Sequence, residues 1–295
     1  MKEIVFTGSA VALVTPFAGE NVDFVKLEEL VEYHINNGTD AILMCGSTGE
    51  GSTLSDEEHL NCIKCAIKKS NKRIPVIASV GSNDTKHAIY LSKAAEKLGA
   101  DALLSVVPYY NKPTQDGLFE HFKAIAQSVN IPIILYNVPS RTITSLSPET
   151  VKRLSDIPNI VGIKECVTAN VSKHIRNCPE DFSVYTGEDT EVLSTMSMGA
   201  KGVISVIANV MPKQMKKLTE SAINGDYEEA RKIQLSLAEI NEYMFIEPSP
   251  VPIKAAMNAL GMNVGDCRLP LLKMTEVNKE KMCNALNKVI EYYNK

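Results

Sequence analysis

Short apolar segments recur along the first two thirds of the chain, and a stretch with helical spacing follows each of them. Eight segments are apolar throughout instead of alternating with polar residues. They span residues 8–14, 41–45, 75–80, 102–107, 131–136, 160–164, 182–186 and 202–207. Uninterrupted apolar strands are typical of parallel sheets that are covered on both faces. Eight strand–helix units in 295 residues predict an α/β fold, a (β/α)8 TIM barrel, in preference to an open doubly wound sheet.

The pattern changes near residue 224, where strand signals stop. Helical spacing continues over residues 227–244, 253–260 and 279–293, and three prolines between residues 248 and 252 interrupt it. We therefore predict a catalytic barrel over residues 1–223 and a small C-terminal helical domain over residues 224–295. Packing or assembly is the default role for that tail.

Composition narrows the classes of partner. Hydrophobic residues make up 44% and charged residues 22%, the net charge is -4, and no lysine/arginine run stands out, so nucleic acid is not expected as a partner. The first residues lack a signal-peptide layout, and no apolar run approaches the roughly 18 residues of a membrane span, so no membrane is expected either. Seven scattered cysteines favour reduced thiols and a cytoplasmic location.

One cysteine pair could carry chemistry. Cys62 and Cys65 form a CxxC, and His59 lies three residues upstream on the same predicted helix face. A zinc site would need a fourth ligand, and usually a second closely spaced pair, neither of which the sequence offers. We interpret the pair as small residues packed on a helix face and expect no metal, with metal or redox use as the less favoured alternative.

Lys164 is an unusual residue for its position, because it ends the apolar segment at residues 160–164. A lysine at a strand end can extend its ammonium to water. Alternatively, burial lowers its pKa and leaves a neutral amine that can attack a carbonyl. Taken alone, this segment favours the first interpretation.

Other polar residues follow the strands at the same ends. In a TIM barrel the C-terminal ends of all strands meet at one mouth, where active sites lie. The residues in question are Ser47 and Thr48, Tyr109 and Tyr110, Tyr136, Arg141, Lys164 and Gly187. Each residue also has an ordinary structural explanation: the serine and threonine could belong to a tight glycine-rich turn, the tyrosines could be packed, and the arginine could be solvated. Their shared placement favours a functional site.

The chemistry of these groups is coherent. The Lys164 amine would form an imine with a ketone, and a tyrosine would supply the proton transfers that imine formation needs. The glycines of residues 46–51 would let backbone N–H groups approach a small carboxylate. The planar guanidinium of Arg141 would hold a second carboxylate. The residues therefore imply a 2-oxo acid and a second anionic substrate.

The chain resembles the dihydrodipicolinate synthase family, which is related to N-acetylneuraminate lyase and other pyruvate aldolases. The resemblance runs from about Gly8 to the C-terminus. Its landmarks are residues 8–16, 46–50, 108–113, 136–142, 162–165 and 202–205. It implies a lyase that condenses pyruvate with L-aspartate 4-semialdehyde to 4-hydroxy-tetrahydrodipicolinate, in the diaminopimelate pathway to lysine. It also implies no cofactor or metal, and a homo-oligomer, most commonly a tetramer built as a dimer of dimers.

The resemblance assigns roles to single residues. Lys164 matches the lysine that forms the Schiff base with pyruvate, and Tyr136 matches the tyrosine that shuttles protons. Thr48 and Tyr110 match the other members of a hydroxyl relay, with Tyr110 reaching across a subunit interface. Arg141 matches the arginine that binds the carboxylate of the semialdehyde.

The remaining positions line the pyruvate pocket or a second cleft. Ser47 stands where many synthases have threonine, and Gly187 and Ile204 match backbone positions of the pocket. The residues that match the cleft where lysine inhibits many synthases are His59, Asn83 and Tyr109. Asp56 and His87 replace the histidine and glutamate of lysine-sensitive forms, so we expect weak or absent inhibition by lysine.

Two alternatives stay open from the sequence. The first is another pyruvate-dependent aldolase, such as an N-acetylneuraminate or keto-deoxy-sugar-acid lyase. Arg141 and the Tyr-Tyr-Asn-Lys-Pro run at residues 109–113 favour the synthase over it. The second is a catalytically silent barrel that binds 2-oxo acids, which the presence of Lys164 and Tyr136 disfavours.

Overall fold

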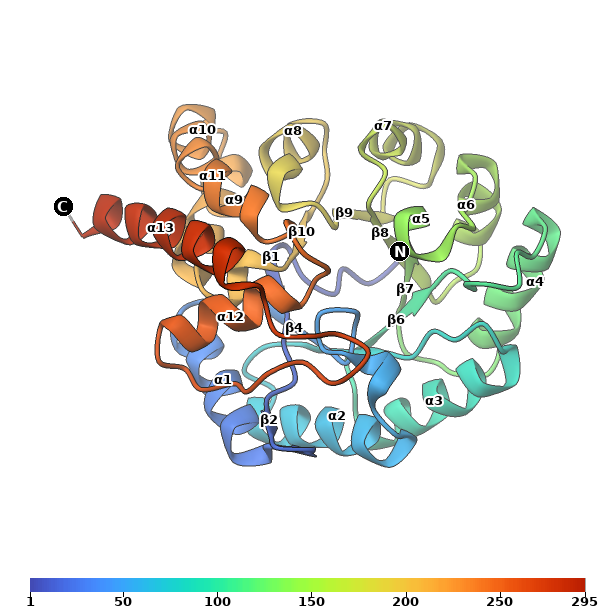
Figure 1. The fold of residues 1–295 in the computed structure, drawn as a ribbon. Helices are drawn as coiled ribbons and strands as arrows, with labels where there is room; N and C mark the ends of the chain where they lie inside the picture. Colours follow the sequence, from blue (N-terminus) through green and yellow to red (C-terminus); the bar gives the residue numbers. More distant parts are fainter. Residues whose placement is uncertain (295) are drawn as a thin grey trace.

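Eight parallel strands form a closed barrel in the computed structural model, which describes residues 1–294 (Figure 1). Around the barrel the strand order is β1, β10, β9, β8, β7, β6, β5 and β4, so that β4 also pairs with β1. The strands are β1 Gly8–Ala12, β4 Ala41–Met44, β5 Val76–Ser79, β6 Ala102–Val106, β7 Ile133–Asn137, β8 Ile160–Glu165, β9 Ser183–Thr186 and β10 Gly202–Ser205. The predicted TIM barrel is confirmed, with strand ends that differ from the predicted ones by at most two residues.

Helices surround the barrel (Figure 1). They are α1 Phe24–Asn36, α2 Asp56–Ser70, α3 Thr85–Leu98, α4 Gln115–Ala126, α6 Pro148–Ser155, α7 Thr168–Asn177, α8 Val192–Ser197 and α9 Pro212–Ile223. Local sequence sets several of their ends. Helix α2 starts with a capping box, in which the Ser55 side chain accepts the Glu58 N–H and the Glu58 side chain accepts the Ser55 N–H. Gly99 ends α3 in the left-handed conformation.

Short elements that the sequence pattern did not indicate lie between these units. A small antiparallel hairpin joins β2 (Phe17–Ala18) to β3 (Asn21–Val22). A single helical turn, α5 (Pro139–Thr142), follows β7. Three 3-10 turns complete the connections, namely η1 (Gly51–Thr53), η2 (Asp189–Glu191) and η3 (Ile207–Asn209).

Alternating strand residues form two apolar layers. Ile42 and Met44 belong to the layer between strands and helices, whereas Leu43 points into the barrel. The inner cluster also contains Tyr136 and Ile204. Side chains on one strand alternate between its two faces. A residue two positions after an inward-pointing one therefore also points into the barrel.

The C-terminal segment is helical, with α10 (Tyr227–Ser236), α11 (Ala238–Tyr243), α12 (Val251–Ala259) and α13 (Glu276–Tyr293). The predicted helix over residues 227–244 is thus two helices that meet at Leu237. Helix α10 packs on α9, while α11 and α12 pack on α13. The domain boundary after residue 223 stays a prediction. Within residues 1–294, no helix combines the length and apolar character of a membrane span.

Candidate active site

Lys164 and Tyr136 lie side by side inside the barrel mouth. Strands β7 and β8 pair in parallel with Tyr136 opposite Lys164, and the Lys164 Nζ lies 4.6 Å from the centre of the Tyr136 ring. Lys164 is only 6% exposed and has no ion pair within residues 1–294. Burial lowers the pKa of its ammonium. The segment at residues 160–164 taken alone favoured a lysine that reaches water, whereas the full set of residues at the strand ends favoured a reactive amine, and the structure shows a buried amine.

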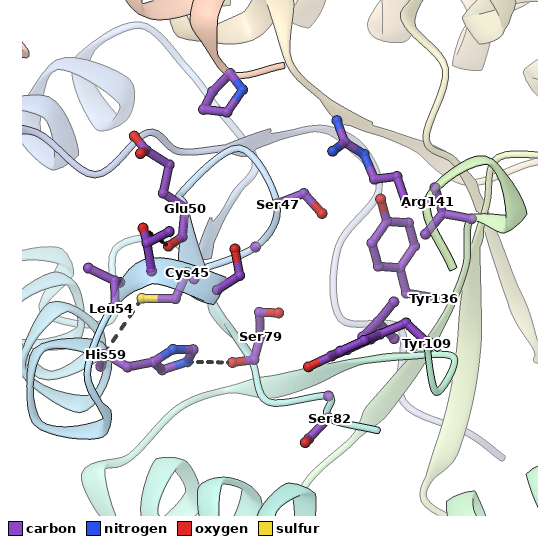
Figure 2. Close-up of a pocket in the computed structure, with 18 of the residues that line it drawn as sticks. Cys45, Ser47, Glu50, Leu54, His59, Ser79, Ser82, Tyr109, Tyr136 and Arg141 are labelled. Atoms are coloured by element: carbon purple, nitrogen blue, oxygen red, sulfur yellow. Dashed lines mark hydrogen bonds between the residues drawn. The ribbon is translucent and has the colours of Figure 1, made fainter. Parts of the chain in front are cut away.

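Burial acts on the Tyr136 hydroxyl in the opposite sense. It raises the pKa of the phenol, and Arg141 and the Ser47 side chain oppose that rise. The phenol therefore keeps its proton at neutral pH and can donate it. In Figure 2 its hydroxyl points toward the space between Ser47 and Arg141.

A hollow of about 610 Å³ opens above Lys164. Among the predicted site residues, it is lined by Ser47, Thr48, Tyr136, Arg141, Lys164 and Gly187. A second hollow of about 530 Å³ shares several of these residues, including Ser47, Tyr136 and Arg141, and continues toward His59 and Tyr109 (Figure 2). The shared lining means that the two hollows meet at the barrel mouth.

The loop at residues 46–51 is folded too tightly for side chains at two of its glycines. A Cβ at Gly49 would lie 2.9 Å from the Leu13 carbonyl oxygen, and a Cβ at Gly51 would lie 2.2 Å from that of Cys45. Glu50 between them adopts a left-handed φ of 51°. This packing places Thr48 in the wall of the hollow with its side chain buried.

Gly187 makes room for the lysine. A Cβ at this position would lie 2.8 Å from the Cε of Lys164 and 2.4 Å from the Sγ of Cys166. Any larger residue would therefore displace the amine or the thiol.

Arg141 stands at the rim on α5. Pro139 begins this turn, and one guanidinium nitrogen, Nη2, donates a hydrogen bond of 3.4 Å to the carbonyl of Ser249 in the C-terminal segment. The guanidinium is exposed and lines both hollows, so most of its donors stay free for an anion.

Three predicted residues lie apart from these hollows in the single chain. Tyr110 is 87% exposed, with a φ of 73°, and lines neither hollow. Asn83 also lines neither, although its carbonyl accepts a 2.8 Å hydrogen bond from Asn111. Ile204 is fully buried in the inner cluster beside Tyr136.

Comparison with known proteins identifies the family to which this fold and site belong. The model of the dihydrodipicolinate synthetase family matches residues 5–289. The chain belongs to this family. A 4-hydroxy-tetrahydrodipicolinate synthase from Acetivibrio thermocellus is 55% identical, over 97% of this chain and 98% of the relative. One from Clostridium novyi is 50% identical, over 98% and 97% respectively.

Solved structures of the family superpose closely on the chain. Dihydrodipicolinate synthase from Aquifex aeolicus is 48% identical, with a TM-score of 0.94 over 96% of this chain and 98% of the other. The chloride-inhibited synthase from Acinetobacter baumannii, solved in complex with pyruvate, is 46% identical with the same TM-score and coverage. The barrel and its C-terminal helices are therefore features of the family.

The sequence did not reveal a buried polar network directly behind Lys164. The Glu165 carboxylate accepts hydrogen bonds from Asn137 Nδ2 at 2.9 and 3.1 Å and from the Val167 N–H at 2.8 Å, and it lies 2.8 Å from His174 Nε2. Asn137 Oδ1 in turn accepts the N–H of Leu146. Glu165, Asn137 and His174 are fully buried. This network fixes the strand ends that carry Tyr136 and Lys164.

The sequence also missed the role of the tail at the mouth. The tail residues that line one or both hollows are Phe245, Ile246, Glu247, Pro248, Ser249, Pro250, Pro270 and Leu271. Lys254 of α12 lies 2.7 Å from the Oε1 of Glu50, and the Arg268 N–H donates to the Oε2. The tail thus holds the loop at residues 46–51 and walls the site, beyond packing or assembly. The charged residues of the tail did not indicate this role in the sequence, because their partners are about 200 residues away along the chain.

The CxxC lies outside the mouth. Cys62 is fully buried on α2 and Cys65 is half-buried, with its Sγ 3.8 Å from the Phe24 carbonyl. His59 instead bonds to the Ser79 carbonyl at 2.7 Å. In the described part of the chain, no three His, Cys, Asp or Glu side chains are grouped to hold a metal ion.

Proposed function

We propose that the chain condenses pyruvate with L-aspartate 4-semialdehyde through a Schiff base on Lys164, and so forms 4-hydroxy-tetrahydrodipicolinate. The observation that carries this proposal is the buried, unpaired Lys164 amine beside Tyr136, in a hollow that Arg141 also lines. Named relatives at 50% identity or more support the substrate pair. The reaction belongs to the lyase class and serves the diaminopimelate route to lysine.

The first step joins pyruvate to the chain. The neutral Lys164 amine attacks the ketone carbon, water leaves, and an imine forms. Tyr136 donates and retrieves the protons of this step, and Thr48 and Tyr110 relay them. Ser47 and Gly187 line the pyruvate pocket, and Ile204, which lines neither hollow, supports it from the buried inner cluster. The imine itself draws electrons from the pyruvate methyl group, so the chemistry requires no dissociable cofactor or metal.

The second step uses the mouth of the barrel. Loss of a methyl proton gives an enamine, whose carbon attacks the aldehyde carbon of the second substrate and regenerates the imine. The amino group of that substrate, once deprotonated, then attacks the imine carbon, which closes the ring and releases the Lys164 amine. Arg141 binds that substrate's carboxylate with its free guanidinium donors. The exposed position of Arg141 at the rim supports this order of binding, because pyruvate must reach the deeper Lys164 first.

The relay requires a second copy of the chain. Tyr110 is too exposed to act in the hollow of its own chain, so we propose that it enters the site of a neighbouring copy in a dimer, and that two dimers form a tetramer. We further propose a cytoplasmic location, which suits seven free thiols. The division into a barrel over residues 1–223 and a helical domain over residues 224–295 is likewise a proposal.

Borohydride reduction in the presence of pyruvate tests the Schiff base. Intact mass should show one covalent adduct on the wild type and none on Lys164→Ala. An Arg141→Ala variant should form the adduct normally but lose most of its turnover of the semialdehyde. A wild type without adduct would refute the proposed reaction, and equal damage to both steps in Arg141→Ala would refute the role of the arginine.

A further inference from the structure

The second substrate has a charged group that the proposed site does not yet accommodate. L-aspartate 4-semialdehyde is an amino acid, with an ammonium beside the carboxylate that Arg141 would bind. An ammonium ion needs hydrogen-bond acceptors, and a carboxylate is the strongest that a protein offers. The carboxylates that line the two hollows are therefore the candidate partners of this ammonium.

Four carboxylates line the hollows, and three of them already have a basic side chain or several hydrogen-bond donors as partners. Glu50 is in the buried ion pair with Lys254. Asp56 lies 3.0 Å from the Nε2 of His87. Glu247 accepts three hydrogen bonds from two neighbours in the C-terminal segment, Thr275 and Asn278.

Glu188 is the fourth, and within residues 1–294 it forms no ion pair. It directly follows Gly187 at the end of β9 and lines the same hollow as Lys164 and Arg141. Its side chain is half-buried. Burial raises the pKa of its carboxyl group, while the Cys166 thiol and the Lys164 charge partly oppose this rise. A bound cation would offset the cost of this half-buried charge.

The neighbouring Asp189 does not compete for this role. Its Oδ2 accepts the N–H groups of Val206 and Ile207, each at 2.9 Å, and its side chain is buried away from both hollows. It ties β9 to the segment after β10. Glu188 is therefore the acidic group of this turn that a ligand can reach.

We propose that Glu188 binds the ammonium of the second substrate while Arg141 binds its carboxylate. This inference rests on the proposed function and adds a specificity-determining residue to it. Two opposite charges in one hollow select an amino-acid aldehyde over an aldehyde that carries only a carboxylate. They also disfavour a sugar acid, which would place hydroxyl groups near Glu188 instead of a cation.

A Glu188→Gln variant tests the proposal, because the amide keeps the size of the side chain and removes its charge. The KM for L-aspartate 4-semialdehyde should rise about 10- to 100-fold, as expected when a charged hydrogen bond is lost. The KM for pyruvate and the yield of borohydride adduct should stay within about twofold of wild type. Glu188→Asp, which keeps the charge, should recover part of the loss.

A competitor without the amino group isolates the ammonium contact. Succinate semialdehyde has the same aldehyde and carboxylate, so its inhibition constant should change little in Glu188→Gln. The matched control is Glu191→Gln, which removes the same charge three residues away, where the carboxylate accepts a 2.6 Å hydrogen bond from Ser194 and lines neither hollow. Its kinetics should match those of wild type.

Three outcomes would overturn the proposal. An unchanged KM for the amino-acid aldehyde would show that Glu188 does not contact it. An equal loss of affinity for both aldehydes would show that the contact is not with the ammonium. A parallel loss of pyruvate adduct would show that Glu188 acts on Lys164 instead. Failure of the wild type to form any adduct would instead refute the proposed function.

Discussion

Two lysines are buried in this molecule to almost the same degree, in two regions with opposite surroundings. At the barrel mouth, Lys164 is 6% exposed and faces a hollow and the ring of Tyr136. Under the C-terminal segment, Lys254 is 1% exposed, and its Nζ lies 2.7 Å from Glu50 and 3.0 Å from the Asp266 carbonyl. Burial lowers the pKa of both ammonium groups. At Lys254 the Glu50 carboxylate opposes the shift through charge and a direct hydrogen bond, whereas at Lys164 the carboxylates of Asp189 and Glu188 oppose it through charge alone.

The difference shows how a buried charge becomes structural or reactive. The Lys254 charge is compensated by a carboxylate and lies 4.1 Å from the Phe17 ring, so it joins the tail to the loop at residues 46–51. Within residues 1–294 no carboxylate lies within ion-pair distance of Lys164, and burial is the largest influence on its pKa, so it favours the neutral amine that imine formation needs. Burial alone therefore does not distinguish the two lysines, whereas burial without an ion pair beside an open hollow supports Lys164 as the proposed nucleophile.

Removal of the two ammonium groups should affect stability differently, and this is the largest effect that we predict. Lys254→Met leaves Glu50 buried without its partner and should lower the free energy of unfolding by about 3–5 kcal/mol. Lys164→Met removes an uncompensated charge and should leave the free energy unchanged or higher, while it abolishes adduct formation. Denaturant unfolding of both variants and the wild type measures the difference.

A double variant provides the control. Glu50→Gln combined with Lys254→Met removes both charges of the pair and should recover part of the stability lost in Lys254→Met. If Lys164→Met costs as much stability as Lys254→Met, the contrast between the two lysines is wrong.

The barrel could be predicted from the sequence because its signals are local. Each buried strand is an apolar run of a few residues, and its helix begins or ends at a local signal such as Ser55 or Gly99. The position of Lys164 at a strand end was readable for the same reason, and the strand order then placed Tyr136 opposite it. The sequence pattern did not predict the β2–β3 hairpin, because its two strands have only two residues each.

The rest of the site depends on contacts between distant residues. Glu50 and Lys254 each look like ordinary surface charges in sequence, and only the fold brings them together. His174 is the same case, since its contact with Glu165 is buried behind the strand ends. Tyr110 shows a different limit, because its predicted role depends on a second copy of the chain.

The pH dependence of stability should separate the two lysines further. Between the lowered pKa of native Lys164 and its usual value of 10.5, the unfolded chain binds more protons at this residue than the native chain does. The free energy of unfolding of the wild type should therefore rise with pH relative to Lys164→Met, by at most about 1.4 kcal/mol per pH unit. The rate of adduct formation should rise over the same range.

Denaturant unfolding of the wild type and Lys164→Met from neutral pH to about pH 10 measures this effect, because titrations of other groups cancel in the difference. Parallel stability curves for the two proteins would mean that Lys164 titrates normally in the native state.

The smallest effect that we predict concerns an exposed hydrogen bond at the second hollow. The side chains of His87 and Asp56 are 39% and 53% exposed, and the two residues line this hollow beside His59 and Tyr109. We expect a bound lysine to place its ammonium near His87, where the family resemblance implies a carboxylate in lysine-sensitive forms, and in this chain the imidazole lies 3.0 Å from Asp56. Lysine at roughly 1 mM should therefore change turnover by less than about twofold, since solvated charges interact weakly.

The exchange Asp56→His with His87→Glu restores the acceptor and should make turnover more sensitive to lysine. Half-inhibition of the wild type below millimolar lysine would contradict this prediction and would show that the ammonium is bound without the residue at position 87.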